Sequence, residues 1–182
     1  MGIYLASIKE GCCDSHLTTF SVIDADALDY KNPTCDKVVE CHDKYILVEE
    51  KSIHIGFFHE CCIALGEDFE SYKYGESNEK LNIDDLQQLL QRLSRERKEA
   101  ILSKKITDLL LSSLDKVSNT TAILCNNPEY DTTKISGMST FYLYCKTGTP
   151  VDRIMHIWLS RYKKNIFIEC QDLKEKLEKD CA

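Results

Sequence analysis

Residues that interrupt regular structure are scarce in this sequence. Only three prolines and seven glycines occur among its 182 residues. This scarcity excludes a collagen-like or Pro/Gly-rich disordered chain, and it predicts that most of the protein is helix and strand. The sequence also has no apolar run of the length of a membrane span and no secretory signal pattern. We therefore expect one cytoplasmic domain, residues 1–182, with no membrane partner.

Positive charge is also in short supply. The chain has 23 Lys and Arg against 30 Asp and Glu, a net charge of −7. Such a balance argues against electrostatic capture of nucleic acid by the surface as a whole. It is compatible with a local basic patch, and carboxylates clustered around a metal would themselves make the chain acidic. The sign of the charge therefore does not select a function.

The ten cysteines lack the spacing of the common zinc modules. Two adjacent pairs occur, Cys12-Cys13 and Cys61-Cys62, but there is no Cys-x-x-Cys. In a chain without a secretory signal, this pattern favours reduced thiols packed as small hydrophobic side chains. A zinc site is the alternative interpretation. Its ligands would come from Cys35, Cys41, His42, His59, Cys61 and Cys62.

The apolar pattern predicts an α/β fold, a central mixed β-sheet flanked by helices. We expect helices at 3–13, 151–162 and 171–179, strands at 18–23, 37–42, 45–51, 121–126, 140–146 and 165–170, and loops at 24–34 and 66–80. Segment 53–65 fits a strand or a helix.

A long helical pattern runs from about residue 82 to residue 117. Asn82 is a suitable N-cap for it, with Asp84 and Asp85 in the first turn. Unbroken, this helix would extend about 50 Å, whereas a compact domain of this length has a diameter of about 40 Å. We therefore expect a break near Ser94–Lys98.

The predicted hairpin of residues 36–51 contains the main candidate site. Because side chains alternate along a strand, Glu49 and Lys51 share one face. A two-residue turn at Asp43-Lys44 places Asp36 opposite Lys51 on the same face, whereas a three-residue turn would place it on the other. The second face then carries an apolar surface suited to a core, made of Val39, Cys41, Ile46 and Val48.

The shared face has the chemistry of a magnesium site. The carboxylates of Asp36 and Glu49 and the backbone carbonyl of Glu50 are hard oxygen ligands, which suit Mg²⁺ or Mn²⁺. Such an ion lowers the pKa of a bound water and stabilises charge on a phosphodiester. Lys51 would orient the attacking water or offset the charge of the scissile phosphate.

The segment Asn32-Pro33-Thr34-Cys35-Asp36, followed by Glu49-Glu50-Lys51, resembles the signature of the PD-(D/E)xK nuclease superfamily. The resemblance implies a restriction-endonuclease-like mixed α/β core with the signature on a β-hairpin. It also implies metal binding by Asp36 and Glu49 and catalysis by Lys51.

Many members of that superfamily add an acidic residue from the preceding helix. Glu10 is the candidate for this further metal ligand, with Asp14 behind it. The chain departs from the pattern in two respects: two residues separate Pro33 from Asp36, and the downstream Gln-x-x-x-Tyr of the recombination-nuclease branch is absent.

A basic segment on the long helix is the candidate nucleic-acid surface. Arg92, Arg95 and Lys98 would contact phosphates, since such charges supply most sequence-independent affinity. The alternative is a solvated helix face, in which these cations alternate with Glu96 and Glu99.

The sequence therefore predicts metal-dependent hydrolysis of DNA or RNA, with three alternatives. One is an inactive nuclease-fold module that binds a protein or nucleic-acid partner, with a homodimer formed through the long helix. Another is a Cys/His zinc-binding protein. The last is an exposed hairpin on which Asp36 and Lys51 form an ordinary surface ion pair.

Overall fold

A computed structural model describes residues 4–6, 14–24, 32–51, 53–74, 80–144, 152, 156, 159 and 166–182. The chain divides into two compact units. The first comprises Met1–Lys9, Ser52–Asp108 and Cys145–Lys163, and the second comprises Glu10–Lys51, Leu109–Tyr144 and Lys164–Ala182. Each unit is treated separately below.

The second unit is built on a five-stranded mixed sheet with the strand order β2-β3-β4-β7-β8. The first three of these strands form an antiparallel meander, and β7 and β8 continue the sheet in parallel. Their bounds are Ser21–Asp24, Lys37–Glu40, Tyr45–Glu50, Ser139–Tyr144 and Phe167–Glu169. Three 3-10 helices complete the unit's short elements: η1 Asp14–His16, η3 Thr132–Gly137 and η4 Cys170–Asp172. The predicted α/β class with a mixed sheet is confirmed.

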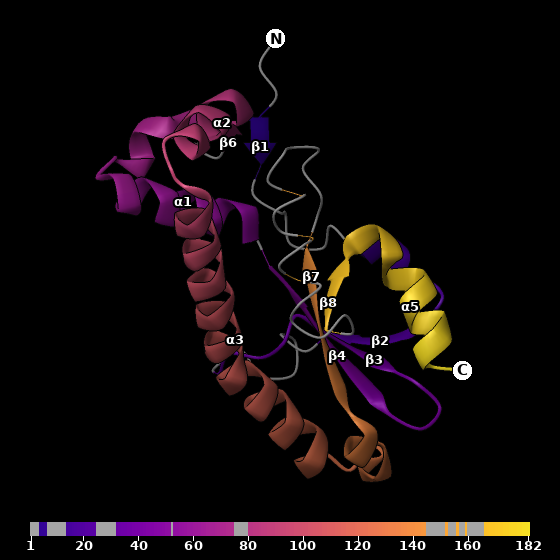
Figure 1. Cartoon of the computed structure of the whole chain (residues 1–182). Coiled ribbons are helices and arrows are strands. Elements are labelled where there is room, and N and C mark those ends of the chain that lie inside the picture. Colours follow the sequence, from indigo (N-terminus) through magenta and orange to yellow (C-terminus); the bar gives the residue numbers. More distant parts are fainter. Residues whose placement is uncertain are drawn as a thin grey trace. The chain divides into compact units, whose positions relative to one another are not determined.

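Helices cover both faces of this sheet (Figure 1). One face packs against the second half of α3 (Arg95–Asn126), where Val38, Tyr45 and Leu47 form a buried cluster with Leu124. The other face meets α5 (Leu173–Asp180), whose following residue, Cys181, is disulfide-bonded to Cys41. Strand β4 is consequently buried on both sides, as is typical of a strand inside a sheet with helices on both faces.

The first unit combines a three-stranded antiparallel sheet, in the order β1-β6-β5, with helices. Its strands are β1 Tyr4–Ala6, β5 Lys73–Tyr74 and β6 Lys80–Asn82. Its helices are α1 Ile53–Leu65, η2 Phe69–Tyr72, α2 Ile83–Gln91 and the first half of α3. On α1, Phe58 makes edge-to-face contacts with Phe69 and Tyr72, the arrangement that aromatic rings prefer.

The predicted break in the long helical pattern is confirmed between α2 and α3. The backbone N–H groups of Arg92 and Leu93 donate to carbonyls three residues earlier, which tightens and ends α2. Ser94 then begins α3, because its hydroxyl accepts from the backbone N–H of Arg97 at 3.2 Å. This contact is an N-cap, and it is the local reason for the break.

Two predictions of secondary structure are wrong. Residues 121–126, expected as a strand, are the last turns of α3. The hydroxyls of Thr120 and Thr121 donate to carbonyls one turn earlier, at 2.8 and 2.7 Å, so the β-branched residues are accommodated within the helix. Residues 4–6, expected as helix, form β1 because they pair with Lys80–Asn82.

The remaining predictions of elements are largely met. Segment 53–65 is a helix, and the strands near 18–23, 37–42, 45–51, 140–146 and 165–170 are present with shifted ends. The segment 66–80, expected as a loop, contains η2 and β5. Most of 3–13 and of 151–162 lies outside the described residues. No helix in the described part of the chain has the length and apolarity needed to cross a membrane.

Candidate functional site

The β3–β4 hairpin brings the predicted acidic residues together, in a register that differs from the expected one. Lys37 pairs with Val48 and Glu40 with Tyr45, so one further step places Asp36 opposite Glu49 rather than opposite Lys51. The turn is His42-Asp43, closed by the N–H of Cys41 donating to the carbonyl of Lys44. The predicted turn was therefore wrong by one residue. It was still a two-residue turn, and a register shift of two preserves the face of every side chain.

Asp36, Glu49 and Lys51 form one connected cluster. The ammonium of Lys51 donates to Glu49 Oε1 at 2.6 Å. One carboxylate oxygen of Asp36, Oδ2, accepts from the backbone N–H of Glu50 at 2.5 Å. This backbone contact fixes the Asp36 carboxylate at the end of β4, beside the Glu49 side chain.

A residue from α3 completes the cluster. Lys116 donates to the same Glu49 oxygen, Oε1, at 2.7 Å, and its ammonium lies 3.6 Å from Asp36 Oδ1. One ammonium is therefore within reach of both carboxylates. All four residues of this group, which we call the acid–lysine cluster, belong to the second unit.

Glu49 is the most unusual member of the acid–lysine cluster, because its side chain is only 1% exposed. Its Oε1 accepts from two lysines, whereas its Oε2 is buried and accepts no hydrogen bond from the residues that the structure describes. A buried carboxylate oxygen without a partner costs free energy, and such atoms are rare in folded proteins. Each such atom calls for an explanation, so Glu49 is the first candidate for a functional role in the acid–lysine cluster.

Electrostatics around the cluster follow from burial. The pKa of Asp36 is raised, first by its removal from water and then by the nearby charge of Glu49. Burial would lower the pKa of Lys116, but the hydrogen bond to Glu49 and the charges of Glu49 and Asp36 outweigh it and raise that pKa. Lys116 is consequently a firmly protonated cation beside both acids.

Further polar side chains of α3 and the sheet are buried and hydrogen-bonded near the cluster. Thr120 accepts from the backbone N–H of Cys35 at 2.9 Å, and Ser113 is hydrogen-bonded to Tyr142 on β7. Burial, followed by the charge of Glu49, raises the pKa of the Cys35 thiol to about 12, so this cysteine is a neutral group rather than a thiolate.

Sequence reasoning missed the contribution of α3. Ser113, Lys116 and Thr120 lie at helical spacings of three and four residues, so they form one polar stripe on the face that meets the sheet. The stripe was hidden because polar residues are frequent all around this helix. Only the packing of α3 against β3 and β4 identifies which of them is buried.

The expectation of a hairpin with an exposed polar face does not describe this protein. Glu49 is buried, and Asp36 and Lys51 are 20% and 13% exposed. Lys51 bonds to Glu49 within its own strand, where a plain surface pair would have joined it to Asp36. The polar residues of this face are therefore part of a covered site.

The other predicted metal ligands are the backbone carbonyl of Glu50 and the carboxylate of Glu10, with Asp14 behind it. The side chain of Glu50 points to the opposite face, as expected from strand alternation, and its backbone N–H binds Asp36. Glu10 lies outside the described residues. Asp14 begins η1, but its side chain also lies outside the described part.

The predicted nucleic-acid contacts belong to the first unit, and two of the three residues form local ion pairs. Arg92 binds Glu67 at 2.6 Å, and Arg95 binds Glu99 one turn along α3 at 3.0 Å. Lys98 follows on α3, where its backbone N–H donates to the carbonyl of Ser94. These contacts agree with a solvated helix face and leave the guanidinium groups accessible to phosphate.

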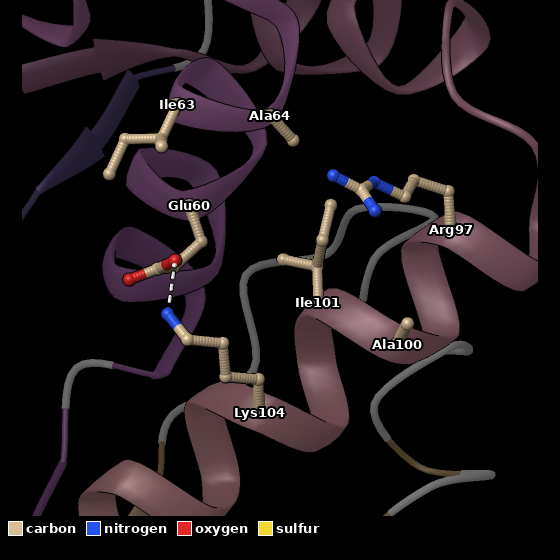
Figure 2. A pocket seen from close by; sticks show the side chains of 7 residues that line it. All are labelled: Glu60, Ile63, Ala64, Arg97, Ala100, Ile101 and Lys104. Atoms are coloured by element: carbon tan, nitrogen blue, oxygen red, sulfur yellow. Dashed lines mark hydrogen bonds and ion pairs between the residues drawn. The ribbon is translucent and has the colours of Figure 1, made fainter.

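A shallow groove of about 280 Å³ lies between α1 and α3 in the first unit (Figure 2). Glu60 on α1 faces Lys104 on α3 across it, 3.1 Å apart, and Arg97 extends over Ile101. The groove is smaller than a typical small-molecule site. Because Glu60 already neutralises Lys104, the groove has the chemistry of an exposed helix–helix junction rather than of a reactive centre.

The cysteines correct one prediction. Cys41 and Cys181 form a disulfide across a sequence separation of 140 residues, and Cys170 is also disulfide-bonded. The expectation of reduced thiols is therefore wrong for these three residues, because tertiary packing brings distant cysteines together. It holds for the buried Cys35, Cys61 and Cys62, which are free.

The zinc interpretation receives no support from the part of the chain that the structure describes. There, no three His, Cys, Asp or Glu side chains are grouped so as to hold a metal ion. Cys41, one of the proposed ligands, is engaged in a disulfide.

The long helix exposes two large apolar side chains. Leu111 and Leu114 on α3 are 60% and 59% exposed, whereas Leu109 and Leu110 are partly covered.

Comparisons with known proteins identify no relative. No protein-family model matches the chain, and no curated protein or solved structure is significantly similar to it.

Proposed function

We propose that this protein is a metal-dependent nuclease that hydrolyses phosphodiester bonds of DNA or RNA at the acid–lysine cluster. The observation that carries the proposal is the buried Glu49 carboxylate with its unpaired Oε2, next to the fixed carboxylate of Asp36. The raised pKa of Asp36, caused by burial and by the charge of Glu49, supports a functional role, because ionisable residues with perturbed pKa values concentrate at functional sites.

The donor set suits Mg²⁺ or Mn²⁺. Asp36 and Glu49 offer hard carboxylate oxygens. The backbone carbonyl of Glu50, the last residue of β4, would be a further oxygen ligand. Magnesium commonly binds through one or two carboxylates and keeps several waters, so it does not require a third acidic side chain. When bound, the ion would supply a more acidic water and charge stabilisation at the phosphate.

Other residues would position the carboxylates, the water and the phosphate. The backbone N–H of Glu50 holds the Asp36 carboxylate in place. Lys51, bonded to Glu49, brings a positive charge to the edge of the site, where it would orient water or offset the charge of a phosphate. The basic residues Arg92, Arg95 and Lys98 would add phosphate contacts.

The arrangement agrees with what the resemblance to the PD-(D/E)xK superfamily implies. The hairpin is part of a mixed sheet that is flanked by helices, and Asp36, Glu49 and Lys51 belong to this hairpin. The restriction-endonuclease-like core and the metal are part of the proposal.

An inactive module with the same architecture is the second candidate, and a specific contact favours it. Lys116 bridges both carboxylates, so its ammonium is able to replace a metal as their counter-ion. In that case the cluster would be structural, and the protein would bind a nucleic-acid or protein partner without cleaving it.

A cleavage assay separates these candidates. Purified protein is incubated with labelled single- and double-stranded DNA and RNA in Mg²⁺, Mn²⁺ or EDTA. We expect cleavage only with a divalent ion, and a loss of about a hundredfold or more in Asp36→Asn, Glu49→Gln and Lys51→Ala, because each removes a group that acts on the reacting atoms.

Glu40→Gln is the matched control. Glu40 is an acid on the same hairpin, but it pairs with Lys134 at 2.7 Å outside the acid–lysine cluster. It should keep full activity. If the wild type cleaves no substrate under any metal condition, or if Asp36→Asn and Lys51→Ala cleave as fast as the wild type, the catalytic proposal fails.

A further inference from the structure

Lys116 lies at the position from which a cation would bridge the two carboxylates of the cluster. Its ammonium is 2.7 Å from Glu49 Oε1 and 3.6 Å from Asp36 Oδ1. Lys51, by contrast, is bonded to Glu49 at 2.6 Å and reaches the cluster from the same strand. Of the two lysines, only Lys116 therefore has both acids within ion-pair distance among the contacts of the described residues.

A divalent ion and Lys116 would use the same two carboxylates. An ion held by Asp36 and Glu49 would lie close to the Lys116 ammonium, which already donates to Glu49 Oε1 and lies 3.6 Å from Asp36 Oδ1. A divalent ion and an ammonium group beside the same pair of carboxylates also repel each other, and the repulsion is strong where little water screens it. Full occupancy by the ion therefore requires the ammonium to move.

The position of Lys116 allows such a movement. Its side chain is 29% exposed, whereas Glu49 is 1% exposed, so the lysine has a path to water and the glutamate does not. A lysine side chain is long and flexible, and its compact ammonium is readily hydrated. The carboxylates stay fixed, since Asp36 is held by the backbone of Glu50.

We propose that Lys116 is an intrinsic competitor of the divalent ion, a positioning residue that holds the two carboxylates together and sets the ion concentration at which the site is loaded. This inference rests on the proposed function, because it assumes that Asp36 and Glu49 bind an ion. It assigns a regulatory role to a residue that lies outside the hairpin and far from it in sequence.

The test is the affinity for Mn²⁺, measured on the whole protein without substrate by titration calorimetry and by the free Mn²⁺ signal in electron paramagnetic resonance. Lys116→Gln should bind Mn²⁺ about tenfold more tightly than the wild type, since removing a competing, partly hydrated charge has a moderate effect. The gain should disappear in Lys116→Gln/Asp36→Asn.

Lys134→Gln is the control for loss of one lysine charge in the same unit. Lys134 pairs with Glu40 at 2.7 Å and touches neither acid of the cluster, so its affinity for Mn²⁺ should equal that of the wild type. If Lys134→Gln tightens binding as much as Lys116→Gln, a general change in charge explains the result and the inference is wrong.

The outcomes also distinguish this inference from the proposed function. Equal, measurable Mn²⁺ affinity in the wild type and Lys116→Gln overturns the competition and leaves the metal site intact. Absence of binding in both proteins overturns the metal site itself.

A measurement on the wild type covers the case in which Lys116→Gln does not fold. The Cε resonance of Lys116, assigned with Lys116→Arg, should shift on titration with Mg²⁺ as the ammonium leaves Glu49, while that of Lys134 stays in place. A Lys116 resonance that is unchanged at saturating Mg²⁺ refutes the proposal.

Discussion

Two lysine–glutamate pairs on the same helix show how burial changes the meaning of an ion pair. In the first unit, Lys104 of α3 binds Glu60 at 3.1 Å, and the two side chains are 63% and 18% exposed. In the second unit, Lys116 of α3 binds Glu49 at 2.7 Å, and the two are 29% and 1% exposed. The chemical groups are the same, and the difference lies in how much water surrounds them.

The difference has energetic and functional consequences. In the exposed pair, water compensates each charge, so little is gained by contact and little is lost by separation. In the buried pair, the Glu49 side chain is almost entirely removed from water, and its Oε2 has no partner within the described part of the chain. Removing Lys116 therefore leaves the buried Glu49 carboxylate with only one of its two lysine partners, Lys51. The comparison predicts that only the second pair is coupled to stability and ligand binding.

The largest expected effect on stability is that of Lys116→Met in metal-free buffer at neutral pH. Breaking a buried ion pair from one side costs several kcal/mol, and partial exposure of the lysine reduces the expected loss of unfolding free energy to about 2–3 kcal/mol. Chemical denaturation followed by circular dichroism measures it. The double variant Lys116→Met/Glu49→Leu should recover part of the loss, because the buried carboxylate is removed together with Lys116, while Lys51 loses its contact with Glu49. A single-variant loss below that of Lys104→Met would contradict the comparison.

An intermediate effect on stability is expected from His54, which is buried in the first unit. It tests whether burial, rather than membership of the second unit, makes an ion pair contribute to stability. His54 is bound to Asp152 at 2.6 Å, and burial lowers its pKa below the ordinary value of 6.5 although Asp152 opposes the shift. The unfolded chain therefore takes up a proton that the folded protein does not. The contribution of His54 to stability is complete above pH 6.5 and is lost as the pH falls below it, toward the lowered pKa.

Denaturation curves measured between pH 7.5 and 5 test whether stability falls as the pH is lowered. Over the window below pH 6.5 the unfolding free energy of the wild type should fall by up to about 1.4 kcal/mol per pH unit from this one group. His54→Gln removes the titrating group, so its curve should be flatter than that of the wild type across the same window. Parallel curves would show that His54 is not the group responsible.

The smallest effect is expected from Lys104→Met. Since the ammonium of Lys104 is largely in water, the midpoint of urea denaturation should stay within experimental error of the wild-type value, at low and high salt alike. Glu60→Gln should behave in the same way. A midpoint shift comparable to that of Lys116→Met would mean that the groove between α1 and α3 is a stronger junction than its exposure indicates.

Much of the local structure was predictable because it depends on neighbours in sequence. The hairpin, the helix break and the face shared by Asp36, Glu49 and Lys51 follow from strand alternation and from the capping chemistry of Ser94. The exact turn was not predictable, since Cys41-His42-Asp43-Lys44 offers two adjacent two-residue turns. The face assignment survived this error because both turns differ in register by two residues.

The contacts that define the site were not predictable, because they join residues that are far apart in the chain. Lys116 reaches Glu49 and Asp36 only through the packing of α3 on the sheet, and the same packing buries Thr120 against Cys35. The strand propensity of residues 121–126 was overridden in the same way, since Leu124 on α3 fills the core with Tyr45 and Leu47.

The sequence by itself determined the alternating hairpin, the mixed α/β class and the presence of two acids and a lysine on one face, because these features follow from local periodicity and local hydrogen bonding. Only the tertiary structure decided that this face is covered, that Glu49 retains an unpaired oxygen, and that a second lysine bridges the acids. The physical reason is that burial and long-range ion pairing are properties of packed elements. A hydrophobic pattern states that a face will be covered, but it does not specify which side chain of a distant helix will cover it.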